Sequence, residues 1–308
     1  MFWRSREKSN SNSMITMRYK DYLQRVLFEE FGARCVYVRL ENVLAEMALR
    51  ADYPPASRRL LSEALLLAAL MSSGLKFSGR ISLQVRGPGP LRLLVADCTD
   101  QGGLRATASG SADSLEESAS LIEVVGADAV LTLTLDPAER GQRWQGVVPL
   151  EGDNLAAALA GYFARSEQLP TRFRLAVNER CAAALMIQRM PGPADDADGW
   201  NRLQHLLASA SSAELLGLDG EALMQRLFHA EARRVYPPRA LDFQCPCSRE
   251  RVANVLVSLG PDELQAMVAE PEPVEVRCQF CNQVYRFDAL DLAALQQGEA
   301  GELGNTVH

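Results

Sequence analysis

Four of the seven cysteines stand in two close pairs near one end of the sequence, and this spacing constrains the fold more than any other feature. Cys245 and Cys247 form a C-x-C pair, and Cys278 and Cys281 form a C-x-x-C pair. Two cysteine pairs separated by a modest loop match the ligand number and the grouping of a closed tetrahedral zinc site. We therefore predict that these four thiolates hold one zinc ion.

The sequence contains no segment that predicts export or membrane insertion. The first twenty residues carry positive charge, but no apolar run long enough for a secretory signal follows them. The longest apolar stretch, ALLLAALM at 64–71, is far shorter than the roughly 18 residues of a transmembrane helix. We expect a soluble cytoplasmic protein, in which thiols stay reduced and paired cysteines indicate metal or redox chemistry rather than structural disulfides.

The distribution of charge argues against nucleic acid and anionic membranes as partners. The formal net charge is −7, and from Cys245 to the end of the sequence four arginines stand against ten carboxylates. Proteins that bind nucleic acid neutralise its phosphates with lysine and arginine side chains. We therefore expect no nucleic-acid binding and no membrane binding.

Length and composition predict a core domain followed by a small module. The 308 residues are enough for about two domains, and 47% hydrophobic residues is typical of a globular protein. We expect a disordered extension at 1–19, an α+β core domain at 20–190 with an antiparallel sheet and packed helices, a metastable helical linker at 191–244 and a C-terminal zinc and redox-switch module at 245–308.

The core domain shows the pattern of consecutive hairpins. Apolar and polar residues alternate over 79–86, and the Gly-Pro-Gly-Pro stretch at 87–90 turns this strand into a second one. The other expected strands are 129–136 paired with 143–150, then 171–177 and 183–190. A helix that is apolar on all sides should run from 54 to a C-cap at Gly74. A second helix should follow the N-cap Asp153 and bury one face, formed by Leu155, Leu159 and Tyr162.

The linker contains short amphipathic helices. Ser211 and Glu214 form a capping box, and Asp219 can cap the helix that follows. The apolar stripe of that helix consists of Leu223, Met224, Leu227 and Phe228. Helices of about ten residues are not stable alone in water. We therefore expect them to be docked on the core domain as a segment that can come off.

The remaining chemistry-bearing residues give little support for catalysis, and we predict that the chain is not an enzyme and has no catalytic residue. His205 and His229 should lie on the polar faces of their helices, and His308 ends the sequence. A zinc ion held by four thiolates has no open position for water or substrate. The isolated cysteines should be small buried hydrophobes; they are Cys35, Cys98 and Cys181.

The segment CQFCNQVYRF at 278–287 has the pattern of a zinc knuckle. The residue after the second cysteine of such a turn often has a positive φ, which asparagine tolerates second best after glycine, so we expect it at Asn282. The aromatic residues Phe280, Tyr285 and Phe287 should supply the core of the small module.

Zinc held in this way can act as a switch. Structural zinc supplies on the order of 10–16 kcal/mol of folding free energy, and a module of roughly 50–60 residues is marginal without it. Oxidants attack thiolates, and a disulfide within a C-x-C or C-x-x-C pair needs little chain movement. A disulfide that closes a loop this short adds only about 2 kcal/mol of folding free energy, so two disulfides cannot replace the metal. Oxidation should leave the module disordered and let the linker helices undock.

These residues carry a resemblance to the heat-shock protein 33 family of redox-regulated bacterial chaperones. The resemblance covers about 24–296 and is strongest in CPCSRER at 245–251, in the knuckle at 278–287 and in the stretches 52–98 and 144–171. Two departures are visible: Asn282 stands where glycine is common in the family, and residues 1–20 have no recognised counterpart, which leaves a start at Met14 or Met17 as an alternative to a disordered extension.

The resemblance implies an ATP-independent stress-response holdase that is inactive while reduced and zinc-bound. Peroxide or hypochlorous acid, with heat, would form disulfides between Cys245 and Cys247 and between Cys278 and Cys281. Zinc release, linker unfolding and homodimer formation would follow. Unfolding client proteins would then bind the linker, about 192–244, and the core face it covers; we assign this contact to Leu223, Met224, Leu227 and Phe228.

Two other classes of function fit parts of the pattern. A constitutive zinc-module adaptor for protein partners would lose binding on oxidation, whereas the chaperone would gain it. A thiol oxidoreductase using CQFC would need one exposed cysteine of low pKa, usually at a helix N-terminus, and would turn over a disulfide substrate. The zinc-like spacing favours the metal site over this enzyme.

Overall fold

The computed structural model describes residues 19–75, 78–138, 141–192, 196 and 198–296. The chain forms two compact units, Met1–Gln244 and Cys245–His308, which are described separately. The predicted extension lies outside the described residues except for Tyr19, and so does His308.

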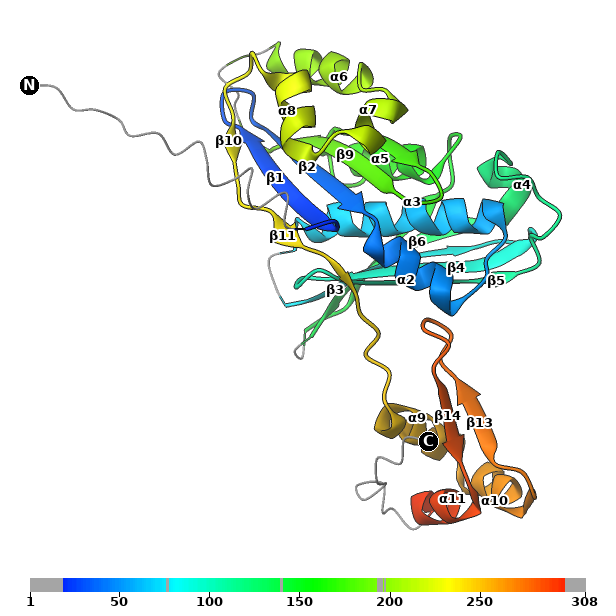
Figure 1. The fold of residues 1–308 in the computed structure, drawn as a ribbon. Helices are drawn as coiled ribbons and strands as arrows, with labels where there is room; N and C mark the ends of the chain where they lie inside the picture. Colours follow the sequence, from blue (N-terminus) through cyan, green and yellow to red (C-terminus); the bar gives the residue numbers. More distant parts are fainter. Residues whose placement is uncertain (1–18, 76–77, 139–140, 193–195, 197, 297–308) are drawn as a thin grey trace, which may run out of the picture. The chain divides into compact units, whose positions relative to one another are not determined.

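The first unit contains two six-stranded sheets (Figure 1). In the first sheet the strand order is β10-β1-β2-β9-β8, and β11 also pairs with β1. All of these pairs are antiparallel. The strands are β1 (Tyr22–Phe28), β2 (Ala33–Leu40), β8 (Thr171–Val177), β9 (Ala182–Arg189), β10 (Arg234–Val235) and β11 (Arg239–Ala240).

The second sheet has the order β12-β5-β4-β3-β6-β7. Its pairs are antiparallel except that between β12 and β5, which is parallel. The strands are β3 (Gly79–Arg86), β4 (Leu91–Thr99), β5 (Gly103–Gly110), β6 (Val130–Pro137), β7 (Trp144–Pro149) and β12 (Asp242–Phe243). The predicted hairpins β3–β4 and β6–β7 and the α+β class are confirmed. The predicted strands β8 and β9 are also present, and they pair with each other. In β3, Ile81, Leu83 and Val85 are buried as the alternation predicts.

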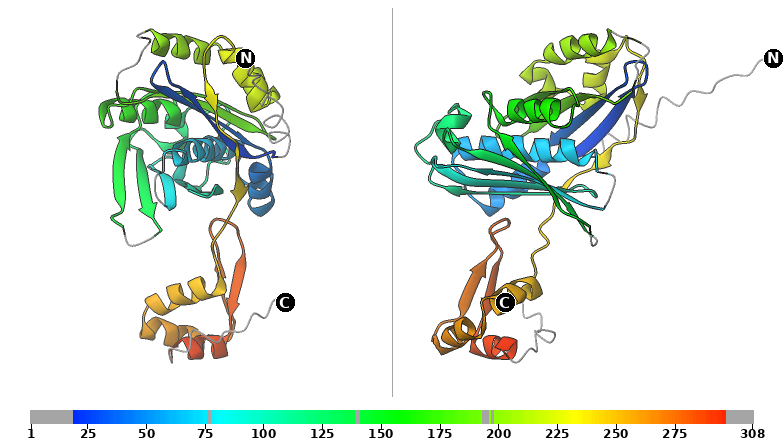
Figure 2. Two further views of the ribbon diagram at one scale, coloured as in Figure 1. Left: turned by 90° about the vertical axis from the view of Figure 1, so that its left-hand side faces the viewer. Right: turned by 180° about the vertical axis from the view of Figure 1, so that it is seen from behind.

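Helix α3 (Pro55–Ser72) forms the centre of the first unit. It contacts strands of both sheets, and Figure 2 shows it between them. Fourteen of its residues are buried, because a helix enclosed by two apolar sheet faces has no solvent side. The predicted C-cap at Gly74 is wrong by one residue: the C-cap is Ser73, whose N–H donates to the Leu70 and Met71 carbonyls.

The other helices of the core are shorter than α3. They are α2 (Asn42–Arg50), α4 (Leu121–Val125) and α5 (Leu155–Arg165). The predicted N-cap Asp153 of α5 is also wrong by one residue, because the side chain of Asn154 accepts the Ala157 N–H. The predicted buried face of α5, formed by Leu155, Leu159 and Tyr162, is confirmed.

Three helices of the predicted linker pack on the first sheet, on the face opposite α3 (Figure 2). They are α6 (Gly199–Ala208), α7 (Ser212–Gly217) and α8 (Gly220–Phe228). The capping box of Ser211 with Glu214 and the Asp219 cap are both present. The stripe of α8 is buried against Tyr22, Phe28 and Tyr37 of the sheet, and the stripe comprises Leu223, Met224, Leu227 and Phe228. The prediction that these helices lie on the core is therefore confirmed.

Hydrogen bonds fix the same helices at their ends. The backbone N–H of Gly220 donates to the Tyr22 hydroxyl at 2.8 Å, and the Arg39 guanidinium donates to the Leu216 carbonyl at 2.9 Å. A Cβ at Gly220 would lie 2.8 Å from a ring carbon of Tyr37, so only glycine lets α8 begin this close to the sheet.

The second unit is built from α9 (Arg249–Ser258), α10 (Pro261–Ala269), α11 (Ala289–Gln296) and the hairpin of β13 (Val274–Arg277) with β14 (Val284–Phe287). Phe287 is fully buried in its core, and Tyr285 packs at the edge. Phe280 does not belong to this core, because it lies in the turn between the strands, so its prediction as a core residue is wrong. Asn282 has φ 57°, as predicted.

The isolated cysteines and the histidines lie where the sequence predicts. Cys35, Cys98 and Cys181 are buried, and His205 and His229 are exposed. Within the described ranges, no helix is both long and apolar enough to cross a membrane.

Leu227→Ala tests how firmly the linker helices are docked. Leu227 is 1% exposed, and truncating a buried leucine in this way costs about 2–5 kcal/mol. We expect faster amide hydrogen exchange in α7 and α8 and increased binding of a hydrophobic dye by the reduced protein. Leu49→Ala is the matched control, because Leu49 is 81% exposed. If both variants bind dye like the unmodified protein, the assignment of this buried face is wrong.

Asn282→Val tests the turn of the β13–β14 hairpin. A β-branched residue at positive φ costs roughly 1–2 kcal/mol, so we expect the hairpin amides to exchange faster with solvent. Gln283→Val is the control, since the exposed side chain of Gln283 follows the turn without a positive φ. Equal exchange in the two variants would contradict the strain argument.

Candidate metal centre

The four paired cysteines come together in the second unit. Cys245 and Cys247 precede α9, and the Ser248 side chain caps this helix by accepting the Arg251 N–H. Cys278 and Cys281 lie in the turn that connects β13 to β14. Their four sulfur atoms all lie within 4.8 Å of one another. A helix N-terminus and a hairpin turn thus present two thiols each to one point.

The spacing of the sulfur atoms fits a tetrahedral metal. The Cys245 and Cys278 Sγ atoms are 3.6 Å apart, and those of Cys247 and Cys281 are 3.3 Å apart. Zinc–sulfur bonds of about 2.3 Å in a tetrahedron place sulfurs about 3.8 Å apart. All four side chains are half-buried, so the centre is shielded but lies near the surface.

Backbone hydrogen bonds hold the hairpin half of the centre. The Asn282 N–H donates to the Cys278 carbonyl at 2.9 Å, and the Cys278 N–H donates to the Gln283 carbonyl at 2.9 Å. These two bonds close the turn around its positive φ. The positions of both hairpin sulfurs are therefore set by the local backbone.

The protonation of the thiols is uneven. Burial alone would raise the pKa of Cys278, but the backbone N–H groups of Cys281 and Phe280 and the neighbouring thiols donate to its sulfur and lower the pKa to about 7. Burial raises the pKa of Cys245 and of Cys281, and neighbouring thiols add to the rise. Four sulfurs this close cannot all carry negative charge unless a cation lies among them.

Tyr285 belongs to the centre, although sequence reasoning placed it only in the core. Its hydroxyl donates a hydrogen bond of 3.1 Å to the Cys247 sulfur. The strand alternation contained the signal: Tyr285 stands two residues before the buried Phe287 on β14, so both side chains point to the same face. The hydrogen bond draws electron density from one ligand sulfur.

Arg249 ties the two halves of the centre together. Its guanidinium donates to the Arg286 carbonyl and to the Asp291 carboxylate, both at 2.6 Å. It also lies over the Phe287 ring, 4.4 Å from the centroid. The helix that follows the C-x-C pair is thus fixed to β14 and α11.

The isolated cysteines differ in both place and chemistry. Cys35 lies on β2 and Cys98 on β4, inside the first unit. Burial raises the pKa of Cys35 to about 12 and that of Cys98 to about 11. These thiols stay protonated at neutral pH and are poor nucleophiles and poor ligands.

The side chains assigned to client binding are covered in this structure. Leu223, Met224, Leu227 and Phe228 all belong to the buried cluster between α6–α8 and the first sheet. They can meet another protein only after α8 leaves the sheet.

Comparisons with known proteins agree with this arrangement. Residues 21–288 match the family described as Hsp33 protein. The chain is 44% identical to the 33 kDa chaperonin of Azotobacter vinelandii, over 90% of this chain and 95% of that protein. It is 42% identical to the 33 kDa chaperonin of Pseudomonas aeruginosa strain LESB58, over 94% of this chain and 98% of that protein.

A solved structure has the same fold. The crystal structure of the 33 kDa chaperonin (heat shock protein 33 homolog) of Thermotoga maritima matches with a TM-score of 0.76 at 24% identity, over 91% of this chain and 99% of that chain. The match of residues 21–288 and the identity to the curated relatives show that this chain belongs to the Hsp33 family.

Proposed function

We propose that the chain is a redox-regulated, ATP-independent holdase, inactive while reduced and zinc-bound. Family membership and relatives named 33 kDa chaperonin support a chaperone function. The observation that carries the redox part is the cluster of four sulfurs within 4.8 Å in the second unit. The proposal places the sensor in that unit and the client-binding surface in the first.

Zinc is the metal that this ligand set fits. Thiolates select zinc over magnesium or calcium, which prefer oxygen ligands, and four of them close the coordination shell. Cys245, Cys247, Cys278 and Cys281 would hold the ion, which when bound supplies folding free energy to the unit around it. Among the described residues of that unit, seven apolar residues form the buried core, so the metal would be a large part of its stability.

Oxidation by peroxide removes the ligands. Two thiolates of a pair lose two electrons and form a disulfide, while one hydrogen peroxide takes these electrons and two protons and becomes two water molecules. We propose the pairs Cys245 with Cys247 and Cys278 with Cys281, which the family resemblance implies. In the folded unit, sulfur contacts of 3.6 and 3.3 Å join Cys245 to Cys278 and Cys247 to Cys281, so forming disulfides within the pairs requires the sulfurs to rearrange.

The chain that leads from the switch to the docked helices is held by short strands and by one buried apolar side chain, that of Leu241. Gln244 ends the first unit, and its N–H donates to the Leu104 carbonyl at 2.9 Å. Before it, β10, β11 and β12 have two residues each and no fully buried side chain. Segments with few buried apolar contacts open at low free energy. We propose that disorder beginning at Cys245 spreads along them.

Undocking would create the client surface. When α6–α8 leave, the stripe of α8 and the sheet residues under it both lose their cover, including Tyr37, Leu185 and Ile187. A contiguous apolar area of this kind binds other apolar chains, which fits unfolding proteins as partners. It would also favour association of two oxidised copies into a dimer.

The first test is light scattering of a heat-unfolding client with the purified full-length chain added reduced and zinc-loaded, or after peroxide at raised temperature. A chromogenic chelator follows zinc release in the same samples. We expect aggregation to be suppressed only after oxidation and in step with zinc release. Zinc release without suppression would reject the holdase and favour the adaptor. Peptide mapping by mass spectrometry identifies the disulfides, and a bond between Cys245 and Cys278 would contradict the proposed pairing.

Cys278→Ser tests whether the metal keeps the linker docked. Replacing one of four thiolate ligands should weaken zinc binding at least about tenfold, because a serine hydroxyl stays protonated and binds zinc poorly. We expect faster hydrogen exchange in the second unit and partial exposure of α6–α8 without any oxidant. Cys181→Ser is the matched control, since Cys181 is an isolated, buried cysteine of the first unit. Full zinc content and unchanged protection in Cys278→Ser would overturn this coupling.

A further inference from the structure

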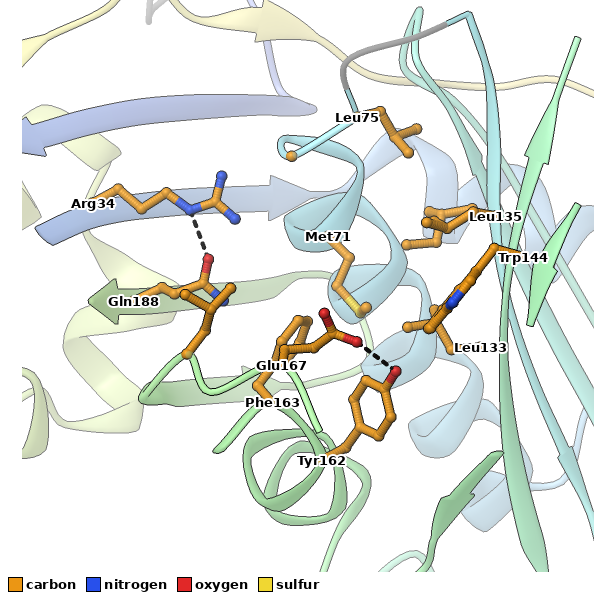
Figure 3. Close-up of a pocket in the computed structure, with 13 residues that line it drawn as sticks. Arg34, Met71, Leu75, Leu133, Leu135, Trp144, Tyr162, Phe163, Glu167 and Gln188 are labelled. Atoms are coloured by element: carbon orange, nitrogen blue, oxygen red, sulfur yellow. Dashed lines mark hydrogen bonds between the residues drawn. The ribbon is translucent and has the colours of Figure 1, made fainter. Parts of the chain in front are cut away.

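A cavity of about 480 Å³ lies in the first unit, and its lining includes no cysteine and no residue of α6–α8. It opens at the end of α3, where the two sheets diverge, and α5 closes its other side (Figure 3). The volume is within the range of small-molecule sites, about 300–1,000 Å³. Nothing in the proposed chaperone function uses this cavity.

Most of the cavity wall is apolar. Met71 of α3 and Phe163 of α5 face Leu133 and Leu135 of β6, and Trp144 of β7 stands at the side (Figure 3). Such a wall releases water readily and favours an aliphatic or aromatic ligand body.

Arg34 supplies a positive charge at one end of the cavity. Its Nε donates to the Gln188 Oε1 at 3.0 Å, and the Gln188 amide donates to the Thr171 hydroxyl at 2.9 Å. The oxygen and the nitrogen of the Gln188 amide are both engaged in hydrogen bonds, so Gln188 holds the Arg34 guanidinium in one orientation. Figure 3 shows it directed from β2 toward the end of α3. A Cβ at Gly74 would lie 3.3 Å from the Nη2 of Arg34, so glycine keeps the space beside this nitrogen open.

Among the ion pairs formed by described residues, none joins Arg34 to a carboxylate. Burial lowers the pKa of the guanidinium, and the positive charge of Arg25 lowers it further. Arginine nevertheless remains charged in proteins, so this desolvated cation lacks the counter-ion that would stabilise it.

The rim of the cavity also carries negative charge. Glu167 is exposed at the rim and accepts a hydrogen bond of 2.8 Å from the Tyr162 hydroxyl. Burial and this carboxylate raise the pKa of Tyr162, so it remains a neutral donor. A second anionic group would be repelled there, which sets the direction of an asymmetric ligand.

We propose that this cavity binds a small amphiphilic monocarboxylate, with its carboxylate on the Arg34 guanidinium and its apolar body against Met71, Leu133 and Trp144. A medium-chain fatty acid anion is the simplest compound of this class. Charge-assisted bonds to a planar guanidinium are strong, and the apolar wall adds the burial of the tail.

Isothermal titration of the reduced, zinc-loaded full-length protein tests the site with octanoate, 1-octanol and octylammonium. We expect octanoate to bind at least about tenfold more tightly than octanol, because the alcohol cannot form the charge-assisted bond, and octylammonium to bind more weakly still. Equal affinity for octanoate and octanol would overturn the proposal.

Variants locate the site. Arg34→Met keeps an unbranched apolar stem but removes the guanidinium, and it should remove the preference for octanoate over octanol. Arg189→Gln is the matched control, because Arg189 is exposed at the end of the same strand as Gln188 and does not line the cavity. Trp144→Ala leaves Arg34 in place and should weaken the binding of octanoate and of octanol to the same degree. If Arg34→Met does not fold, this second variant still tests the cavity. Octanoate binding unchanged in Trp144→Ala, or reduced as much by Arg189→Gln as by Arg34→Met, would contradict this cavity as the site.

Discussion

The first sheet has two apolar faces, and the rest of the molecule depends on how each of them is covered. Seven of the eight residues of β9 are buried, and β2 is nearly as enclosed. Helix α3 covers one face and is itself enclosed by the second sheet. The other face is covered by α6–α8, which are short helices from the end of the first unit. An apolar sheet face left open to water would bind other chains, so the docked helices determine whether this surface is available.

The covering helices combine strong packing with weak local stability. Phe228 and Leu223 are fully buried against the sheet, yet each helix has ten residues or fewer. Helices of this length do not persist in water without their tertiary contacts. Undocking and unfolding are therefore nearly the same event for this segment. A change that weakens the docking produces disorder and an exposed apolar surface together, which is the behaviour that a holdase requires.

The features that the sequence predicted are those that local patterns determine. Hairpins, helix faces and the cap at Asp219 follow from alternation and spacing over a few residues, and the four clustered cysteines follow from two short motifs. Two caps are displaced by one residue from their predicted positions. Asn154 stands beside Asp153, which caps equally well, and Ser73 keeps a right-handed helical backbone that does not require glycine. Strand β5 was not predicted, because its small side chains give weak alternation.

Long-range pairings could not be predicted from these patterns. Strand β2 pairs with β9, and Arg34 meets Gln188 across a separation of 154 residues. Nothing near either residue in the sequence indicates the other. The hydrogen bond from Tyr285 to Cys247 is of the same kind, since it joins β14 to the residue before the Ser248 cap. Pairs of this type determine the cavity and tune the sulfur cluster, so the sequence alone revealed the metal motif but not its surroundings.

In the proposed switch, the free energies decide how the two units are coupled. Moving a two-state segment from 1% to 99% open requires about 5.5 kcal/mol of differential stabilisation. Loss of a structural zinc ion removes on the order of 10–16 kcal/mol, while two short disulfides return about 2 kcal/mol each. The net loss of folding free energy is therefore enough to unfold the second unit. The chain from Cys245 back to β10, whose strands have two residues each, connects the second unit to the docked helices. Zinc loss alone therefore lowers the cost of undocking without removing the apolar contacts of α8. Heat must supply the remaining free energy of undocking, because it weakens the short helices while the oxidant unfolds the second unit.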